Sequence, residues 1–184
     1  MQPLERKPQV NWQGLDKKRH FCAISTHPIR RLACANIAHA APKGMLSIVI
    51  VNWNTKALLE KCLASLQQHA PAESFEVIVV DNASEDGSAA MVRSRFPQVR
   101  LLTERANHGY AAGNNIGIRA ALGDAILLLN PDTEFIDDSL QRSVDILRSM
   151  PTVGVLAARL VSPDGSTQSS LRSFPRPLPV LFDL

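Results

Sequence analysis

Apolar and polar residues follow one another along this chain in a pattern that predicts alternating strands and helices. Short runs of Val, Ile and Leu are typical of strands, whereas apolar residues three and four positions apart indicate amphipathic helices. The runs predict strands at 46–51, 75–80, 99–103, 125–129 and 153–160. The helical spacing predicts helices at 56–69, 109–122 and 138–150, and a further helix opened by Ser84.

This alternation favours an α/β fold, with a mostly parallel sheet and flanking helices in a Rossmann-like arrangement. The run Ile126–Leu129 is four large aliphatic residues, which is typical of a strand buried on both faces. Pro131 ends that strand, because proline cannot donate to the ladder. A Ser-Pro-Asp-Gly turn at 162–165 is expected to separate two short extended pieces.

The first 44 residues lack a sustained period and are interrupted by four prolines. We expect a mostly disordered extension, residues 1–44, before one domain at 45–184. One short helix around Ile29–Ile37 and a translation start at Met45 are alternatives within that region. The extension has eight basic and two acidic residues, so its charge is +6, while the remainder carries −3. Its basic clusters are short and have few aromatic neighbours, so no nucleic-acid partner is expected.

Cysteine usage and hydropathy restrict the class of protein further. The three cysteines are scattered, which predicts neither a disulfide framework nor a metal-binding pair. A reducing, cytoplasmic location is therefore expected. No apolar run is long enough to span a bilayer, and the first thirty residues do not resemble a secretory signal.

Polar residues and glycines follow four of the predicted strands, where the loops of a parallel sheet gather along one edge and bind ligands. They are Asn52, Asn54, Asp81, Asn82, Asn107, Gly109, Gly113, Asn114, Asn130 and Asp132. One interpretation is that these loops only cap helices, because Asn54 or Thr55, Ser84, Asn107 and Asp132 are good N-cap residues. Caps do not account for Asp81, nor for the two amides on either side of Trp53.

As a binding site, the same residues form a coherent set. Asp81 can accept the N3–H of uracil or thymine, because an ionised carboxylate only accepts hydrogen bonds. Gly109 and Gly113 permit close approach of the backbone to a sugar or phosphate, at a helix start that favours anions. Asp132 suits a divalent cation that also binds a diphosphate. No glycine fingerprint for a dinucleotide or a P-loop is present, which weakens a nicotinamide-binding Rossmann interpretation.

Three nearby residues have competing interpretations. Trp53 either stacks on a base or packs in the core under the sheet edge, and the sequence does not favour one over the other. Tyr110 is expected to be a packing residue at a helix start. Cys62 lies on an apolar helix face and is expected in the core.

Four segments of the chain together resemble glycosyltransferase family 2, with the GT-A nucleotide-sugar fold. They are SIVIVNWN at 47–54, VIVVDNAS at 77–84, NHGYAAGNN at 107–115 and LLNPDT at 128–133. A later Asp-Gly turn at 164–165 and RSFP at 172–175 are also similar to the family. The resemblance covers residues 46 to about 178 and is nearest to the rhamnosyltransferase-like branch, which acts on bacterial cell-surface polysaccharides.

The resemblance implies an inverting sugar transfer that depends on Mg²⁺ or Mn²⁺. The donor would be a UDP- or dTDP-sugar, such as dTDP-rhamnose, and the acceptor a glycan or a lipid-linked glycan. Lipid-linked acceptors would bring the protein to the inner face of the bacterial cytoplasmic membrane as a peripheral protein.

The family's site can be carried over by position. Asp81 resembles the base-reading aspartate, the loop with Asn52 and Asn54 would line the nucleoside pocket with Asn82, and Gly113-Asn114 would lie near the ribose and diphosphate. Asp132 stands at the last position of the Asp-x-Asp metal motif. Its first position is Asn130 here, so the metal would depend more on the diphosphate.

The family's general base would lie in a region beyond Leu184. The chain therefore resembles the donor-binding half of a transferase, truncated at its C-terminal end. The alternative is a non-catalytic nucleotide-sugar-binding fragment that lacks the base.

Overall fold

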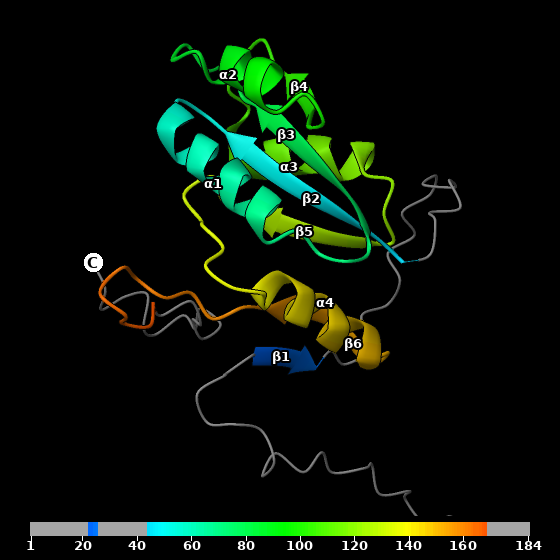
Figure 1. The fold of residues 1–184 in the computed structure, drawn as a ribbon. Coiled ribbons are helices and arrows are strands. Elements are labelled where there is room, and N and C mark those ends of the chain that lie inside the picture. Colours follow the sequence, from blue (N-terminus) through cyan, green and yellow to red (C-terminus); the bar gives the residue numbers. More distant parts are fainter. Residues whose placement is uncertain (1–21, 26–43, 169–184) are drawn as a thin grey trace, which may run out of the picture. The chain divides into compact units, whose positions relative to one another are not determined.

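The computed structural model describes residues 22–25 and 44–168 (Figure 1). The chain divides into two compact units, and each is described by itself here. The described residues of the larger unit are 44–149. Those of the smaller unit are 22–25 and 150–168.

The larger unit is a four-stranded parallel sheet flanked by helices, which confirms the predicted α/β class (Figure 1). Its strands are β2 (Met45–Asn52), β3 (Ser74–Asp81), β4 (Arg100–Thr103) and β5 (Ala125–Leu129), in the order β4-β3-β2-β5. Its helices are α1 (Lys56–Gln68), α2 (Ser88–Arg95), α3 (Gly109–Ala120) and α4 (Ser139–Ser149).

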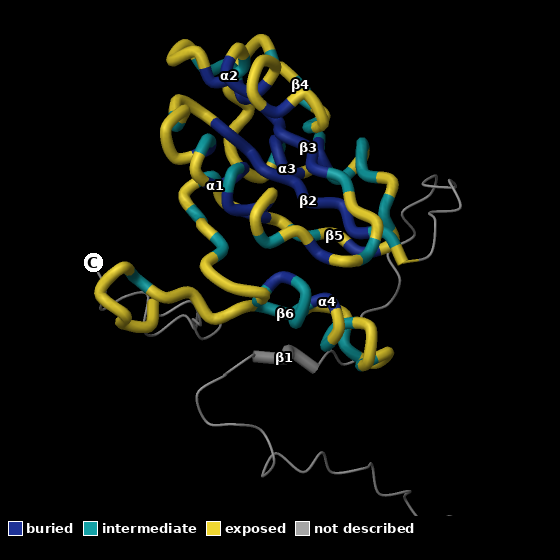
Figure 2. The backbone as a smooth tube through the Cα atoms, viewed as in Figure 1, coloured by how far each residue is buried: buried dark blue, intermediate teal, exposed yellow. Residues whose placement is uncertain are grey.

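The two central strands, β2 and β3, form the buried middle of this unit (Figure 2). Seven of the eight residues of β2 are buried, as are the last five of β3. A strand in this position has helices over both faces, so both sets of alternating side chains must be apolar. This explains why continuous Val and Ile runs predicted these strands to within about two residues.

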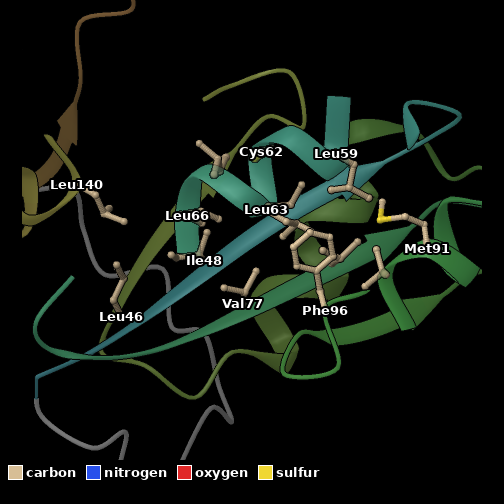
Figure 3. Close-up of a cluster of buried hydrophobic side chains, with 14 of the residues drawn as sticks. Leu46, Ile48, Leu59, Cys62, Leu63, Leu66, Val77, Met91, Phe96 and Leu140 are labelled. Atoms are coloured by element: carbon tan, nitrogen blue, oxygen red, sulfur yellow. The ribbon is translucent and has the colours of Figure 1, made fainter. Parts of the chain in front are cut away.

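Helices cover both faces of the sheet. On one face, Ile48 and Ile50 of β2 pack with Leu59, Cys62 and Leu63 of α1, together with residues of α2 and α4 (Figure 3). This confirms the prediction that Cys62 belongs to the core. On the other face, α3 lies against β2 and β3.

Two glycines allow α3 to approach the sheet closely. A Cβ atom at Gly113 would lie 2.7 Å from Val51 Cγ1, and one at Gly117 would lie 2.3 Å from Val49 Cγ1. Both distances are shorter than any real contact between carbon atoms, so a side chain at either position would push the helix outward. Close packing therefore explains Gly113 and Gly117.

The prediction that the strand at 125–129 is buried on both faces is wrong. Ile126 and Leu128 are 42% and 47% exposed, whereas Leu129 is only 7% exposed. The reason is position in the sheet, since β5 is an edge strand whose one partner is β2. Neither Ile126 nor Leu128 belongs to a core cluster of the described residues.

The predicted start of the second helix at Ser84 is also wrong. Helix α2 begins at Ser88, after Gly87 with φ +81°. Asp86 makes the contacts expected of Ser84: its carboxylate accepts the Ser88 N–H at 3.0 Å and the N–H of Lys56, the first residue of α1, at 2.7 Å. Partial burial acts to raise the pKa of Asp86, but the hydrogen bonds from Ser88 and Lys56 outweigh it and hold that pKa below its ordinary value.

The smaller unit contains a two-stranded antiparallel sheet of β1 (Cys22–Ser25) and β6 (Val153–Ala157). The strand expected at 153–160 therefore does not belong to the parallel sheet. Strand β1 lies within residues 1–44, for which a mostly disordered extension was expected. The expected turn is present: Gly165 N–H donates to the Ser162 carbonyl, and Val161 and Thr167 form an antiparallel bridge. The alternative helix at 29–37 and the motif at 172–175 lie outside the described residues.

Every helix in the part of the chain that the structure describes is too short or too polar to cross a lipid bilayer.

Candidate functional site

The register of the sheet brings the carboxyl ends of its strands to one edge. Asn52 at the end of β2 pairs with Asp81 at the end of β3, and Asp81 pairs with Thr103 at the end of β4. On the other side, Ile50 pairs with Leu129, the last residue of β5. The four loops predicted to form a site therefore leave the sheet side by side, as parallel strands require.

The first two loops are braced by a buried hydrogen-bond network around Asp81. Asn52 Nδ2 donates to Asp81 Oδ1 at 2.9 Å and to Ser84 Oγ at 3.0 Å. The Ser84 N–H donates to Asp81 Oδ2 at 3.3 Å, and Thr55 Oγ1 donates to Asn52 Oδ1 at 2.6 Å. Asn52 and Asp81 are 0% and 3% exposed, so each needs these partners to offset desolvation.

These loops also contain two residues in left-handed backbone conformations. Asn54 has φ +52° and Ala83 has φ +64°. Asn tolerates this region, while alanine there costs about 1 kcal/mol or more. The Asn54 conformation lets its Oδ1 accept the Glu85 N–H at 2.8 Å, while its own N–H donates to Ser84 Oγ at 2.9 Å. The loop after β2 is therefore fixed to the loop after β3 by both side chain and backbone.

A second network holds the start of α3. Asn82 Nδ2 donates to Asn107 Oδ1 at 3.0 Å and to the Gly109 carbonyl at 3.2 Å, and Asn82 Oδ1 accepts the His108 N–H at 3.2 Å. Asn107 Oδ1 also accepts the Gly109 N–H at 2.8 Å, but the N-cap position of α3 is His108 rather than Asn107 as the capping interpretation had it. Gly109 has φ +78°, which favours glycine at the turn into the helix.

The Asn-Pro-Asp-Thr segment after β5 forms a turn, in which the Thr133 N–H donates to the Asn130 carbonyl at 3.2 Å. It is not a helix cap, because α4 begins only at Ser139. The same carbonyl accepts the Cys62 thiol from α1 at 3.8 Å. Burial, together with the negative charges of Asp132 and Glu134, raises the pKa of Cys62 to about 12. The thiol is therefore a neutral donor beneath the turn.

A pocket of about 440 Å³ lies at this edge of the sheet. Its lining residues come from the end of β2, from all four loops and from the first turns of α1 and α3. They are Val51, Trp53, Thr55, Leu58, Asn82, Asn107, Gly109, Tyr110, Asn130, Pro131 and Asp132. Asp132 is the one acidic member of this set.

The pocket settles two of the alternatives left by the sequence. Trp53 is 55% exposed and lines the pocket, so it is not a core residue. Tyr110 is 54% exposed, and its hydroxyl donates to Asn130 Oδ1 at 2.9 Å, so the expectation of a packing residue is wrong. Both aromatic rings are available to a ligand at this edge.

The predicted site residues divide into two groups. Asn82, Gly109, Asn130 and Asp132 line the pocket. The others are not among the lining residues: Asn52, Asn54 and Asp81 belong to the bracing network, Gly113 lies against Val51, and Asn114 Nδ2 donates to the Tyr110 carbonyl at 3.0 Å.

Sequence reasoning missed Thr55, Leu58 and Pro131 as lining residues, and it placed Tyr110 elsewhere. Their common signal is position, since each lies within six residues of a strand end or at the start of a helix that follows a strand.

The residues present fit a divalent cation that arrives with its own phosphate ligands. Among residues 44–168, no group of three or more His, Cys, Asp or Glu side chains is arranged to hold a metal ion. Asp132 supplies a single carboxylate, and Mg²⁺-type ions are commonly bound by one or two carboxylates plus substrate phosphates. A metal that required a closed cage of protein ligands would not fit here.

Several known proteins with similar sequences are named as glycosyltransferases. A relative named N-acetylglucosaminyl-diphospho-decaprenol L-rhamnosyltransferase, from Mycobacterium tuberculosis, is 33% identical over 143 residues, which are 71% of this chain and 46% of the relative. An uncharacterized glycosyltransferase from Haemophilus influenzae is 30% identical over 112 residues, 61% of this chain and 37% of the relative. This chain thus spans less than half the length of these curated relatives.

Solved structures of glycosyltransferases have a similar fold. A mannosyltransferase from Pyrobaculum calidifontis, in complex with GDP-Man and Mn²⁺, has a TM-score of 0.53 and 26% identity, covering 58% of this chain and 33% of that one. Staphylococcus aureus TarS has a TM-score of 0.52 at 21% identity, covering 57% of this chain and 20% of that one, and supports the GT-A fold alone.

The glycosyl transferase family 2 model matches residues 47–182, which include every loop at the carboxyl edge of the sheet. The chain therefore belongs to glycosyltransferase family 2.

Proposed function

We propose that this chain binds the donor in an inverting, metal-dependent sugar transfer from a pyrimidine nucleotide-sugar. The observation that carries the proposal is the composition of the pocket, which is lined by the single carboxylate of Asp132 together with Asn130, Trp53 and Tyr110. The carboxylate suits the metal ion that accompanies the charged diphosphate, and the exposed aromatic rings suit the flat base of the same nucleotide.

The base would lie against Trp53, whose exposed ring offers a stacking surface. Asp81 is the candidate to accept the N3–H of uracil or thymine: it is 3% exposed and does not itself line the pocket, but it directly precedes Asn82, which does. Its Oδ2 retains acceptor capacity, because its one partner among the described residues is the Ser84 N–H at the long distance of 3.3 Å. The bracing by Asn52 would hold this carboxylate in a fixed orientation.

Asp132 would hold Mg²⁺ or Mn²⁺ together with the donor's diphosphate. The ion, when bound, neutralises the charge that develops on the leaving diphosphate. The mannosyltransferase from Pyrobaculum calidifontis is in complex with GDP-Man and Mn²⁺, which supports a divalent ion at this site. Because Asn130 is neutral, we expect little metal binding without nucleotide.

For the sugar and acceptor, the relative from M. tuberculosis supports a rhamnosyl group, as from dTDP-rhamnose, and a lipid-linked acceptor. Such an acceptor favours a peripheral position at the inner face of a bacterial cytoplasmic membrane.

Calorimetric titration of the full chain with UDP, dTDP and GDP, each with and without Mn²⁺, tests the proposal. We expect UDP and dTDP to bind only with Mn²⁺, more tightly than GDP, and Asp132→Ala to weaken that binding at least about tenfold, as for loss of a charged contact. Absence of pyrimidine nucleotide binding, or an unchanged affinity in Asp132→Ala, would overturn it. Asp145→Ala, an exposed acidic residue on α4, serves as the matched control.

A non-catalytic nucleotide-sugar-binding role is the second candidate. The observation that favours it is that Asp132, already assigned to the metal, is the one acidic lining residue and no histidine lines the pocket. Incubation of the purified chain with a radiolabelled nucleotide-sugar and a lipid-linked glycan distinguishes the two. Transfer of label to the acceptor would rule out the non-catalytic role.

A further inference from the structure

We propose that Tyr110 is a positioning residue for Asn130. By holding the side-chain oxygen of Asn130, it makes that residue a hydrogen-bond donor to the diphosphate of the nucleotide rather than a ligand of the metal. The inference rests on the proposed function, since it assigns a role within the same donor site.

The contact joins two loops that lie far apart in the sequence. Tyr110 is in the first turn of α3, and Asn130 follows β5 directly. The Tyr110 hydroxyl donates to Asn130 Oδ1 at 2.9 Å, and both residues line the pocket. The hydrogen bond therefore determines which end of the Asn130 side-chain amide, oxygen or NH₂, is turned toward Tyr110 and which is available to a ligand.

The two ends of an asparagine amide have opposite chemistry. Its oxygen accepts hydrogen bonds and can ligate a cation, whereas its NH₂ group only donates. Tyr110 engages one lone pair of the Asn130 oxygen, whereas the NH₂ group is the end of the amide without a partner, since Asn130 Nδ2 donates to no residue in the described part of the chain. An NH₂ donor is complementary to a phosphoryl oxygen and cannot bind a metal ion.

Asp132 lies two residues further along the same turn and only accepts. The turn thus places a donor and a carboxylate on one wall of the pocket. A diphosphate carrying a divalent cation presents the matching pair of groups, namely anionic oxygens and a positive ion. The assignment divides the work of the Asn-Pro-Asp turn, with Asn130 for the anion and Asp132 for the cation.

Both partners of the contact are themselves held in place. The Tyr110 carbonyl accepts Asn114 Nδ2 at 3.0 Å, and the Asn130 carbonyl accepts the buried Cys62 thiol at 3.8 Å. The phenol thus extends from an anchored helix start to an anchored turn. Such fixed supports are what a hydrogen bond needs in order to orient an amide before a ligand arrives.

Calorimetry of the full chain with UDP and Mn²⁺ tests the role through a double-mutant cycle of Tyr110→Phe and Asn130→Ala. Tyr110→Phe removes only the hydroxyl and keeps the ring. We expect it to weaken UDP binding about threefold to tenfold, the range for one hydrogen bond. Asn130→Ala is expected to weaken binding at least as much, and the double variant should equal Asn130→Ala alone. Asn115→Ala, an exposed asparagine of α3 outside the pocket, should leave the affinity unchanged.

Three results would overturn the role of Tyr110 while the proposed function stands. These are an unchanged UDP affinity in Tyr110→Phe, an equal loss when the same change is made in the Asn130→Ala background, or a tighter Mn²⁺ affinity in Tyr110→Phe. Absence of UDP binding by the unsubstituted chain would overturn both proposals.

A measurement without ligand tests the contact itself. The ¹H–¹⁵N signals of the Asn130 side-chain amide are identified by their loss in Asn130→Ala. We expect them to shift in Tyr110→Phe, while the remaining dispersed signals show that the variant is folded. Unmoved amide signals in a folded Tyr110→Phe variant would contradict the contact and overturn the inference.

Discussion

Amide side chains at the ends of the strands have two tasks in this molecule. Asn52 and Asn54 tie the loops to one another, Asn130 lines the pocket, and Asn82 does both. The sequence predicted that these positions are polar and lie at one edge, because strand order and turn chemistry are local signals. It could not separate bracing from lining residues, since that depends on which side chain lies above which in the folded loops.

Cys62 shows how a single core residue can make stability depend on pH. Its folded-state pKa of about 12 lies above its ordinary value of 9.0, because burial and the nearby carboxylates of Asp132 and Glu134 disfavour the thiolate. The unfolded chain gains from ionising this thiol above pH 9, and the folded chain does not. The contribution of Cys62 is therefore fully present below pH 9 and is lost as the pH rises toward 12.

We predict that urea denaturation between pH 8 and 11 will show a steeper loss of unfolding free energy in the unsubstituted Cys62 protein than in Cys62→Ala. The difference in slope should approach about 1.4 kcal/mol per pH unit above pH 9. Cys22 and Cys34 are replaced by serine in both proteins, so that Cys62 is the only thiol that differs. Parallel pH profiles for the two proteins would contradict the assignment.

At the scale of elements, the burial of the two central strands was predicted well and the burial of the edge strand β5 was not, although its bounds were. Burial on both faces produces an unbroken apolar run, as in β2 and β3. Strand β5 has an equally apolar sequence, yet alternate residues are exposed. A run of leucines indicates that a strand can be buried. Only the order of the strands in the sheet shows which elements lie against that strand.

The adjacent residues Leu128 and Leu129 provide a matched test of this difference. Leu129 is 7% exposed and belongs to the core, so Leu129→Ala should lower the unfolding free energy by about 2–5 kcal/mol. Leu128 is 47% exposed, so Leu128→Ala should cost less than about 1 kcal/mol. Chemical denaturation measures both. Equal losses would mean that the exposed face of β5 is covered in solution.

Helix α2 illustrates a different limit. Ser84 is a good capping residue by type. However, Ala83 before it is in the left-handed region, and the backbone N–H of Ser84 donates to Asp81. The helix then begins four residues later, where Asp86 accepts the Ser88 N–H. Capping preferences rank residue types, and they do not choose among several candidates within one loop.

At the scale of the whole molecule, the order of strand-end loops predicted the parallel sheet and its ligand-binding edge. The departure of residues 153–157 from that sheet was not predictable, because an apolar run does not name its partner strand. All residues that line the pocket lie between Val51 and Asp132, within the larger unit. The smaller unit supplies none of them.

We therefore predict that a fragment of residues 44–149 folds and binds UDP with Mn²⁺ about as tightly as the full chain, within about twofold, since distant groups contribute independently. Circular dichroism during thermal unfolding checks the fold, and calorimetry checks the affinity. The Asp132→Ala version of the fragment is the control for site-specific binding. A folded fragment with greatly weakened affinity would show that residues outside 44–149 contribute to the donor site.

The aromatic lining of the pocket has a consequence for detecting ligands. Tyr110 is the one tyrosine of the chain, and Trp53 is one of two tryptophans. Replacing Trp12 with phenylalanine would leave a single indole, more than half exposed, beside the expected base. Its emission spectrum would then report nucleotide occupancy without an attached dye. The affinities of different donors could therefore be compared by fluorescence titration of unlabelled protein.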